Sequence, residues 1–391
     1  MTSSSLTLFA QQEPAISTIG STEIDAPVDW LASTFADRLK QVDLVGLGEV
    51  SHGSSDIFKL KAKLVQYLVE REGYKTLLFE LDDARLRPLN AYLCNKSPAN
   101  IQIIDSLFNK QFNQVEGSLS LNNIDLKNLL NWLKGYNLAH PSGFVSLRGI
   151  DNNISFEYIK KHYMDTASVK WMHDTYGIKN ISLAEGIKMV DTWYAKFGAD
   201  IMGRLSPAEQ INLKMDLENF KSDMRYNNGG GEKNRAMMTL RDSMMSVNVA
   251  QLKNGKTMVW AHNMHIVNSD FVKVHFRAKM LGHFLKEKYN KEYFVILTDF
   301  SDHALINVMK SNDLFKPRNF TSNKNSLASR LFHQFNISSG IVFSEELNNK
   351  GLPYGFNNIG LSGEENFAEG APTGFDMLFF FKDIHPARIV Q

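Results

Sequence analysis

The feature that most constrains the fold is an apolar run that leads into a polar turn flanked by glycines, Val45-Gly-Leu-Gly-Glu-Val-Ser-His-Gly-Ser54. Residues 43–47 have the length and composition of a buried parallel strand, and apolar residues recur at helical spacing over 57–68. The turn therefore lies between a strand and a helix. In an open parallel sheet such junctions gather at the carboxyl edge, where ligands bind. We predict that Glu49 and His52 lie on the floor of an active site.

Similar apolar runs follow along the chain, and each ends at a polar residue. A helix over 57–71, ended by Gly73, connects the first strand to a second strand over 76–80. A right-handed crossover makes these two strands parallel, so Glu80 lies on the same edge as Glu49. The pattern indicates an α/β fold with a mostly parallel sheet. The further strands that we predict cover 144–150, 256–261 and 293–297, and two candidates for antiparallel edges cover 340–343 and 377–381.

A long helical stretch interrupts this pattern between the third and fourth strands, over about 156–248. Within it, Ser206-Pro-Ala-Glu209 has the pattern of a capping box with proline at the first helical position. The run 227–231, Asn-Asn-Gly-Gly-Gly, is either a lid or, as we expect, an exposed linker between two antiparallel helices. We predict a loose N-terminal arm over 1–25 and a single α/β domain over 26–391.

Composition narrows the classes of protein and partner. The 391 residues contain 43 Lys plus Arg and 42 Asp plus Glu, for a net charge of +1, and there is no basic run with interleaved aromatic residues. Nucleic acid is therefore an unexpected partner. We find no signal peptide pattern and no apolar stretch of the roughly 20 residues that span a bilayer. The one cysteine, Cys94, excludes an internal disulfide, and a reducing, cytoplasmic setting fits.

Polar residues with acid-base chemistry gather at the predicted carboxyl edge. The segment Trp260-Ala-His-Asn-Met-His265 leaves a strand and carries two histidines three residues apart. Together with Glu49, His52 and Glu80, residues His262 and His265 predict a shared catalytic or metal site. For Glu49 and His52 taken alone, a helix cap with a histidine bonded nearby is an equally good interpretation.

Several other polar residues are candidates for the same site. Lys61 falls near the apolar face of its helix, where a lysine either extends to solvent or points at the acidic site. Asp151 ends the third strand, and Asn263 lies between the two histidines. Arg241, Asp242 and Asn248 lie on another helix, and their side chains face either solvent or the site. We predict that Asp151, Arg241 and Asn263 bind the substrate.

Other chemistries find little support in the sequence. There is no Gly-x-Ser-x-Gly elbow, no Walker loop, no Gly-x-Gly-x-x-Gly before a helix and no paired cysteine motif. We expect Ser51 to serve helix entry and not to be a nucleophile, because adjacent side chains point in different directions. We expect Cys94 to act as a small buried hydrophobe.

In order and spacing, these motifs resemble the erythromycin esterase family. The resemblance covers about 42–383 and rests on the Gly48-Glu-Val-Ser-His-Gly53 and Ala261-His-Asn-Met-His265 motifs, with Leu-Phe-Glu80 and Arg241-Asp between them. It implies a three-layer α/β fold whose helical insertion forms part of the pocket, and hydrolysis of a small-molecule ester or lactone by activated water. It also implies a link to antibiotic or natural-product metabolism, macrolide resistance included.

By the same resemblance, His52 matches the general base, Glu49 and Glu80 match paired acidic residues, and His262 and His265 match the second histidine motif. The family commonly has arginine where this chain has Lys61, and lysine supplies a point charge instead of a planar fork. This difference bears on the identity of the substrate.

Three hypotheses about function follow from the residues and the resemblance. The first is a metal-independent hydrolase, with no cofactor, in which His52 takes a proton from water and Glu49 orients its ring. In this scheme Glu80 places the water, His262 or His265 protonates the leaving oxygen, and Lys61 stabilises the oxyanion. The second is a hydrolase that binds a divalent metal through the same cluster. The third is a natural-product or polysaccharide tailoring or binding protein that does not hydrolyse.

Overall fold

The computed structural model describes residues 28–35, 37–112, 122–177, 182–268, 272–273, 277–310, 314–347, 355–369 and 374–389. The arm predicted over 1–25 lies outside the described residues. The first described helix, α2 (Trp30–Phe35), buries Leu31 and Phe35. None of the described helices is long and apolar enough to cross a membrane.

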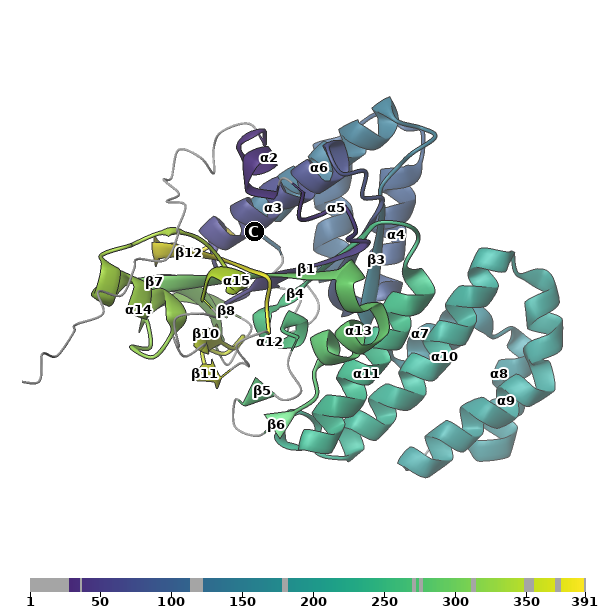
Figure 1. Ribbon diagram of the computed structural model, residues 1–391. Helices are drawn as coiled ribbons and strands as arrows, with labels where there is room; N and C mark the ends of the chain where they lie inside the picture. Colours follow the sequence, from purple (N-terminus) through teal and green to yellow (C-terminus); the bar gives the residue numbers. More distant parts are fainter. Residues whose placement is uncertain are drawn as a thin grey trace, which may run out of the picture.

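The centre of the molecule is a twisted eight-stranded sheet with the order β3-β2-β4-β1-β7-β12-β9, and β8 pairs with β7 (Figure 1). The strands β3, β2, β4, β1, β7 and β12 run parallel to their neighbours in this order, whereas β9 and β8 are antiparallel to theirs. The predicted α/β fold with a mostly parallel sheet is therefore confirmed. The bounds are β1 (Leu44–Glu49), β2 (Thr76–Asp82), β3 (Ser146–Asp151), β4 (Thr257–His262), β7 (Tyr293–Lys310), β8 (Leu314–Thr321), β9 (Gly340–Phe343) and β12 (Met377–Ile384).

Two strand predictions need correction. Of the two candidates for antiparallel edges, β9 is one, but β12 lies inside the sheet and runs parallel to β7. Strand β7 also continues to Lys310, well beyond the predicted end at residue 297, because its second half pairs with β8 as an antiparallel hairpin.

Helices cover both faces of the sheet, which makes three layers (Figure 1). Successive residues of β1 point to opposite faces, so Val45 joins the core under α2, α3, α4, α5 and α6, while Leu44 joins the core under α11, α13 and α14. Every residue of β1 is buried, as expected for a strand with a helical layer on each side. The bounds are α3 (Ser55–Glu70), α4 (Asp83–Cys94), α5 (Ile101–Phe112), α6 (Ile124–Ala139), α11 (Arg235–Leu252), α12 (Asn263–Ile266), α13 (Leu281–Tyr289), α14 (Leu327–Phe335) and α15 (Ser344–Leu347).

The helical stretch between β3 and β4 projects to one side of the sheet and has a core of its own (Figure 1). The predicted capping box is present, because the Ser206 side chain accepts from the backbone of Glu209 and the Glu209 side chain accepts from that of Ser206. Helices α10 and α11 pack against each other, and the run 227–231 includes the end of α10 and the start of the connection to α11. This run therefore connects two packed helices, as predicted. The bounds are α7 (Phe156–Tyr163), α8 (Thr166–Tyr176), α9 (Leu183–Arg204), α10 (Pro207–Asn228) and the 3-10 helix η2 (Gly231–Lys233).

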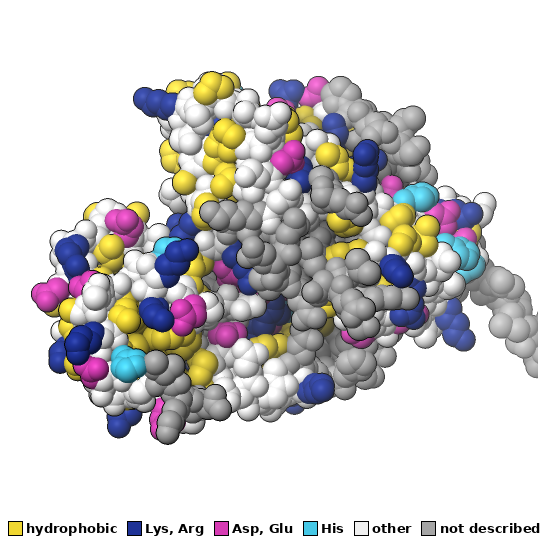
Figure 2. Space-filling view, turned by 180° about the vertical axis from the view of Figure 1, so that it is seen from behind, with side chains coloured by type: hydrophobic (Ala, Val, Ile, Leu, Met, Phe, Trp, Pro, Cys, Tyr) yellow, Lys and Arg dark blue, Asp and Glu magenta, His cyan; other side chains and the backbone are white. Residues whose placement is uncertain are grey.

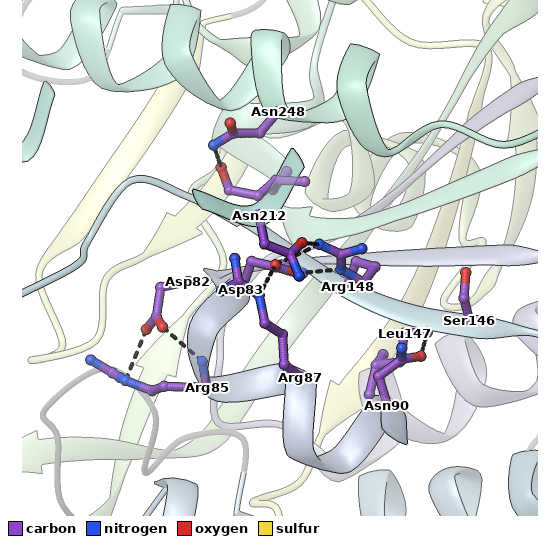
Figure 3. A network of polar contacts seen from close by, with 12 residues as sticks. Asp82, Asp83, Arg85, Arg87, Asn90, Ser146, Leu147, Arg148, Asn212 and Asn248 are labelled. Atoms are coloured by element: carbon purple, nitrogen blue, oxygen red, sulfur yellow. Dashed lines mark hydrogen bonds and ion pairs between the residues drawn. The ribbon is translucent and has the colours of Figure 1, made fainter. Parts of the chain in front are cut away.

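A buried ionic network fastens this helical part to the edge of the sheet. Asp83, at the start of α4, accepts from Nε of Arg87 at 2.7 Å and from Nε of Arg148, on β3, at 2.7 Å (Figure 3). The Arg87 guanidinium also forms two bonds of 2.6 and 2.7 Å with Asp216 on α10. Burial raises the pKa of Asp83, but its bond with Arg148 and the charge of Arg87 outweigh burial and lower it. The network therefore joins α4, β3 and α10 through fully paired charges.

A second, four-stranded sheet was not predicted. Its order is β10-β11-β5-β6, and it adjoins the turn after β1 because the Ile359 N–H donates to the carbonyl of Val50 at 3.0 Å. The face in Figure 2 mixes basic and acidic side chains with apolar ones and contains a charged hollow, in line with the net charge of +1. The bounds are β5 (Val272–Lys273), β6 (Arg277–Ala278), β10 (Gly355–Ile359) and β11 (Glu365–Glu369), with a 3-10 helix η3 (Asn290–Glu292) before β7.

Candidate active site

Glu49, the last residue of β1, is a buried carboxylate with three donors. Its Oε1 lies 2.7 Å from Nδ1 of His52, and its Oε2 accepts from Nζ of Lys61 at 2.7 Å and from Nε1 of Trp260 at 2.8 Å. Burial alone raises the pKa of Glu49, but the Lys61 charge and the bond with His52 outweigh burial and lower it to about 2. Glu49 is therefore ionised at neutral pH and held at both oxygens.

His52 lies in the turn between β1 and α3, and 24% of its side chain is exposed. A carboxylate accepts, so Nδ1 carries the proton and donates to Glu49 in the neutral ring, which leaves the Nε2 lone pair free. No described residue bonds to Nε2. Burial lowers the pKa of His52, but its bond with the Glu49 carboxylate outweighs burial and raises the pKa above 6.5.

The two glycines beside this turn are required by packing and not by unusual backbone angles. Neither Gly48 nor Gly53 has a positive φ. A Cβ on Gly48 would lie 2.3 Å from the Asn263 side chain, and a Cβ on Gly53 would lie 2.1 Å from the carbonyl of Asn307. The glycines therefore let the turn approach its neighbours closely, and side chains and backbone fill the space beside them.

Lys61, on α3, points at the acidic site, as predicted for one of its two alternatives. Its side chain is fully buried, and Nζ bonds to Glu49 Oε2 and, at 3.5 Å, to the carbonyl of Ala261. Nζ also lies 4.2 Å from the centre of the Trp260 ring. Burial lowers the pKa of Lys61 to about 8, although the Glu49 charge opposes the shift. This placement supports a charge that balances Glu49, and it does not support direct contact with a substrate.

His262, at the end of β4, lies beside Glu49 in the sheet register, and its ring centre is 5.0 Å from that of His52. Its Nε2–H donates to the Val50 carbonyl at 3.1 Å, and its Nδ1 accepts from the backbone N–H of Met264 at 3.4 Å. Burial and the charge of His52 lower the pKa of His262 to about 3. His262 is therefore neutral, and both of its nitrogens bond to backbone.

His265, on α12, lies between two carboxylates. Its Nδ1 is 2.7 Å from Asp242 and its Nε2 is 3.1 Å from Oε1 of Glu80. Burial lowers the pKa of His265, but Asp242 and Glu80 outweigh burial and raise it to about 10. His265 is thus a buried cation at neutral pH, and it donates to both carboxylates.

Glu80, near the end of β2, connects the two histidines. Its Oε2 accepts from the backbone N–H of His262 at 2.9 Å, and its Oε1 also accepts from Arg241 at 3.2 Å. Burial raises the pKa of Glu80, but His265 and Arg241 outweigh burial and lower it well below the usual value. The Glu80 charge also acts to raise the pKa of His52.

Arg241 and Asp151 face each other across the gap between α11 and β3. The guanidinium forms bonds of 3.0 and 2.7 Å with the two Asp151 oxygens, and both side chains are 14% exposed. The Arg241 pKa lies above its ordinary value, because the Asp151 and Glu80 charges outweigh burial. The structure thus brings together Glu49, His52, Lys61, Glu80, Asp151, Arg241, His262 and His265 at the carboxyl edge of the sheet.

Part of the chain matches a known protein family. The family model described as Erythromycin esterase matches residues 203–382, which include Arg241, Trp260, His262 and His265. The resemblance to the erythromycin esterase family is confirmed. No curated protein sequence matches the chain.

Three solved structures are similar to this chain in fold. A Bacillus cereus protein is 20% identical with a TM-score of 0.74 over 96% of this chain and 97% of that chain. A succinoglycan biosynthesis protein is 20% identical with a TM-score of 0.72 over 96% of each chain. A mutant of the erythromycin esterase EreC, in its open conformation, is 16% identical with a TM-score of 0.67 over 96% of this chain and 99% of that chain. At these identities the likeness establishes the fold alone.

Three other residues discussed from the sequence, one of them a predicted substrate-binding residue, lie away from a substrate. The Asn263 side chain is fully buried and bonds to the Thr298 backbone, donating at 2.6 Å and accepting at 3.3 Å, which does not support contact with a substrate. Ser51 accepts from the Gly53 N–H at 3.1 Å, whereas Ser54 is the N-cap of α3. Cys94 is half-buried, and burial raises its pKa to about 11, so its thiol is unreactive at neutral pH.

Sequence reasoning missed two residues that bond to the candidate site residues. We did not include Trp260 among the site residues, although a buried indole N–H requires an acceptor and could have been flagged on that ground. Asp242 was left open between solvent and site, and the structure places it against His265 and against the N–H of Leu281, both at 2.7 Å. The adjacent charged pair Arg241-Asp242 on one helix was the available signal.

The donor set at this edge does not fit a divalent metal. Both nitrogens of His262 and of His265 have protein partners, so Nε2 of His52 is the one histidine nitrogen there with a free lone pair. Protein zinc sites use three or four His, Cys, Asp or Glu ligands, and among the described residues of this edge no three such ligand atoms lie within 4.8 Å of one another. Elsewhere in the described part of the chain, ligand atoms of Asp302, His303 and Asp383 lie within 4.8 Å of one another, with Nζ of Lys382 3.8 Å from Asp302. Independence from metal stays a prediction.

Proposed function

We propose that the protein is a metal-independent hydrolase that cleaves a small-molecule ester or lactone with water activated by His52. The observation that carries this proposal is the Glu49–His52 pair. Glu49 accepts the Nδ1 proton at 2.7 Å, and the Nε2 lone pair has no bonding partner among the described residues. A histidine held in this tautomer by a carboxylate is suited to take a proton from water.

The reaction needs two proton transfers at His52. In the first, Nε2 takes a proton from water as the oxygen attacks the ester carbonyl, and the resulting imidazolium is stabilised by ionised Glu49. In the second, the C–O bond of the tetrahedral intermediate breaks and the His52 imidazolium passes its proton to the leaving oxygen. The products are a carboxylic acid and an alcohol, which are joined in one molecule when the substrate is a lactone.

The two cations bonded to Glu80 supply positive charge to the site. Arg241 is partly exposed, while His265 is held as a cation by Asp242 and Glu80. We assign Arg241, the partly exposed cation, the electrostatic stabilisation of the oxyanion, a role that often supplies a large part of the rate enhancement. The burial of Lys61 argues for a different role, the balance of the Glu49 charge. Of the two histidines offered as the acid, His265 carries a proton at neutral pH and His262 does not, but carboxylates hold both N–H groups of His265.

We propose natural-product lactones, macrolides among them, as the first substrates to test, in line with the name of the family that the sequence matches. A cytoplasmic location remains our proposal as well, motivated by the single cysteine. The deciding experiment is a hydrolysis screen against macrolides, simple lactones and aryl esters, with and without chelator. Turnover that survives the chelator supports the proposal. No turnover of any ester would move the assignment to a protein that binds without hydrolysis.

A further inference from the structure

Two donors of different kind share one oxygen of Glu49. The Lys61 ammonium and the Trp260 indole N–H both bond to Oε2, at 2.7 and 2.8 Å, whereas Oε1 bonds to Nδ1 of His52. A carboxylate oxygen has two lone pairs in the plane of the group. Oε2 is therefore fully used by these two donors, and Oε1 is the oxygen that remains for the histidine.

Aromatic neighbours fix the orientation of the Trp260 ring, and its N–H points at Glu49. The side chain is 1% exposed and lies between Phe79, with ring centres 5.2 Å apart and planes 23° apart, and Phe58, with ring centres 5.5 Å apart. The Lys61 ammonium lies over the ring face at 4.2 Å. The ring face thus contacts the Lys61 ammonium, and the N–H at the ring edge bonds to the Glu49 carboxylate.

We propose that Trp260 is a positioning residue for the His52 base, which acts by holding Glu49 Oε2 so that Oε1 stays directed at Nδ1. This inference rests on the proposed function for its catalytic consequence. Because the indole donor is neutral, it occupies Oε2 without adding a second positive charge beside Glu49. A second cation there would weaken the attraction between Glu49 and the imidazolium.

Removal of this one donor has a defined electrostatic result. In Trp260→Phe the aromatic stack and the face under Lys61 are kept, while Oε2 loses one of its two donors. The Glu49 charge is then less neutralised, so the pKa of His52 rises, and the carboxylate is freer to rotate. The charged or titratable groups that act on His52 are Glu49, Glu80, Lys61 and His262, and the substitution alters none of them.

The test compares Trp260→Phe with Trp193→Phe. Trp193 is also fully buried, but no described residue bonds to its indole N–H. Trp193→Phe therefore removes an indole N–H without breaking a hydrogen bond to a described residue. We expect Trp260→Phe to lower kcat about 10- to 100-fold, the loss of one hydrogen bond to a charged group, with a smaller change in KM. We also expect an upward shift of the pH midpoint of kcat/KM and of the His52 pKa measured by NMR. Trp193→Phe should change neither.

The NMR titration of His52 needs no substrate, so it tests the inference even if no hydrolysed ester is found. In the unmodified protein, the indole N–H resonance of Trp260 should shift with pH at the midpoint of His52, because Glu49 bonds to both. That measurement stands if Trp260→Phe fails to fold. An indole resonance that does not follow His52, or a folded variant whose His52 pKa and kcat match the parent, would overturn the proposal.

Discussion

Oε1 of Glu49 lies 2.7 Å from Nδ1 of His52, although the two residues are separated by a tight turn at the end of a strand. The other Glu49 oxygen is held by Lys61 and Trp260, from a helix and from the neighbouring strand. Three elements of the sheet edge thus fix one carboxylate. The local sequence motif supplies the pair, and the tertiary structure fixes its direction.

The first prediction concerns pH. A base must be unprotonated, and the bond with Glu49 raises the His52 pKa above 6.5. We therefore expect kcat/KM to fall as pH decreases through this raised pKa, with a slope of one proton. Folding stability depends on pH in the opposite direction. The stabilisation of the fold by the bond between protonated His52 and Glu49 is complete below the unfolded pKa of 6.5 and is lost as pH rises through the folded pKa. A rate profile that is flat from pH 5 to 9 would contradict the role of His52.

Lys61 gives a prediction about stability and rate together. Lys61→Met leaves Glu49 buried without its cation, which should lower the free energy of unfolding by about 3–5 kcal/mol and raise the Glu49 pKa. The rate should fall mainly in kcat. Lys61→Arg keeps the charge but enlarges the group in an enclosed space, so it should retain part of the activity. Lys40→Met, which removes an exposed ion pair with Asp37, is the control and should change little. Turnover within twofold of the parent in both Lys61 variants would remove Lys61 from the site.

Asp242 gives a prediction that separates His265 from His52. Asp242→Asn removes the strongest charge that holds the proton on His265, so the His265 pKa should fall below its value of about 10. Because folding raises the pKa of His265, its protonation stabilises the fold fully below about pH 6.5, and this contribution is lost as pH rises towards 10. Urea unfolding at pH 7 should therefore show a loss of stability in Asp242→Asn. Asp302→Asn, beside the exposed His303, is the control. An unchanged His265 titration by NMR would contradict the assignment.

The sequence predicts where the strands of the sheet end better than it predicts which elements pair with them. The turn with Glu49 and His52 was predictable because a short apolar run must end at the sheet edge. Strand β8 was missed because its sequence includes Pro317 and two basic residues, a composition that suits an antiparallel edge strand but does not identify one.

The direction of β12 and the role of Trp260 depend on contacts that no local pattern contains. Strand β12 has an apolar sequence that fits either direction, and its pairing with β7 decides that it runs parallel. The acceptor of the Trp260 N–H is Glu49, which is 211 residues away in the chain. The position of Lys61 beside the acidic site was one of two alternatives, because a lysine on the apolar face of a helix either extends to solvent or needs a buried partner. Its complete burial could not be read from spacing.

The metal prediction follows from the partners of the histidines. Because His262 and His265 already use both nitrogens, we expect purified protein to contain no stoichiometric divalent metal and to keep its activity after dialysis against a chelator. Elemental analysis beside the activity assay checks both statements. About one zinc ion per chain, lost together with activity on chelation and restored with it, would contradict this prediction.

The most direct test of the account is the rate of His52→Ala beside its thermal stability. His52 is partly exposed, so its removal should leave the melting temperature close to that of the parent, while loss of a general base should lower kcat by roughly 10² to 10⁴. His333→Ala, at an exposed position of α14, is the matched control and should retain full activity. A folded His52→Ala variant that hydrolyses the same ester at a rate close to the parent would contradict the assignment of His52 as the base.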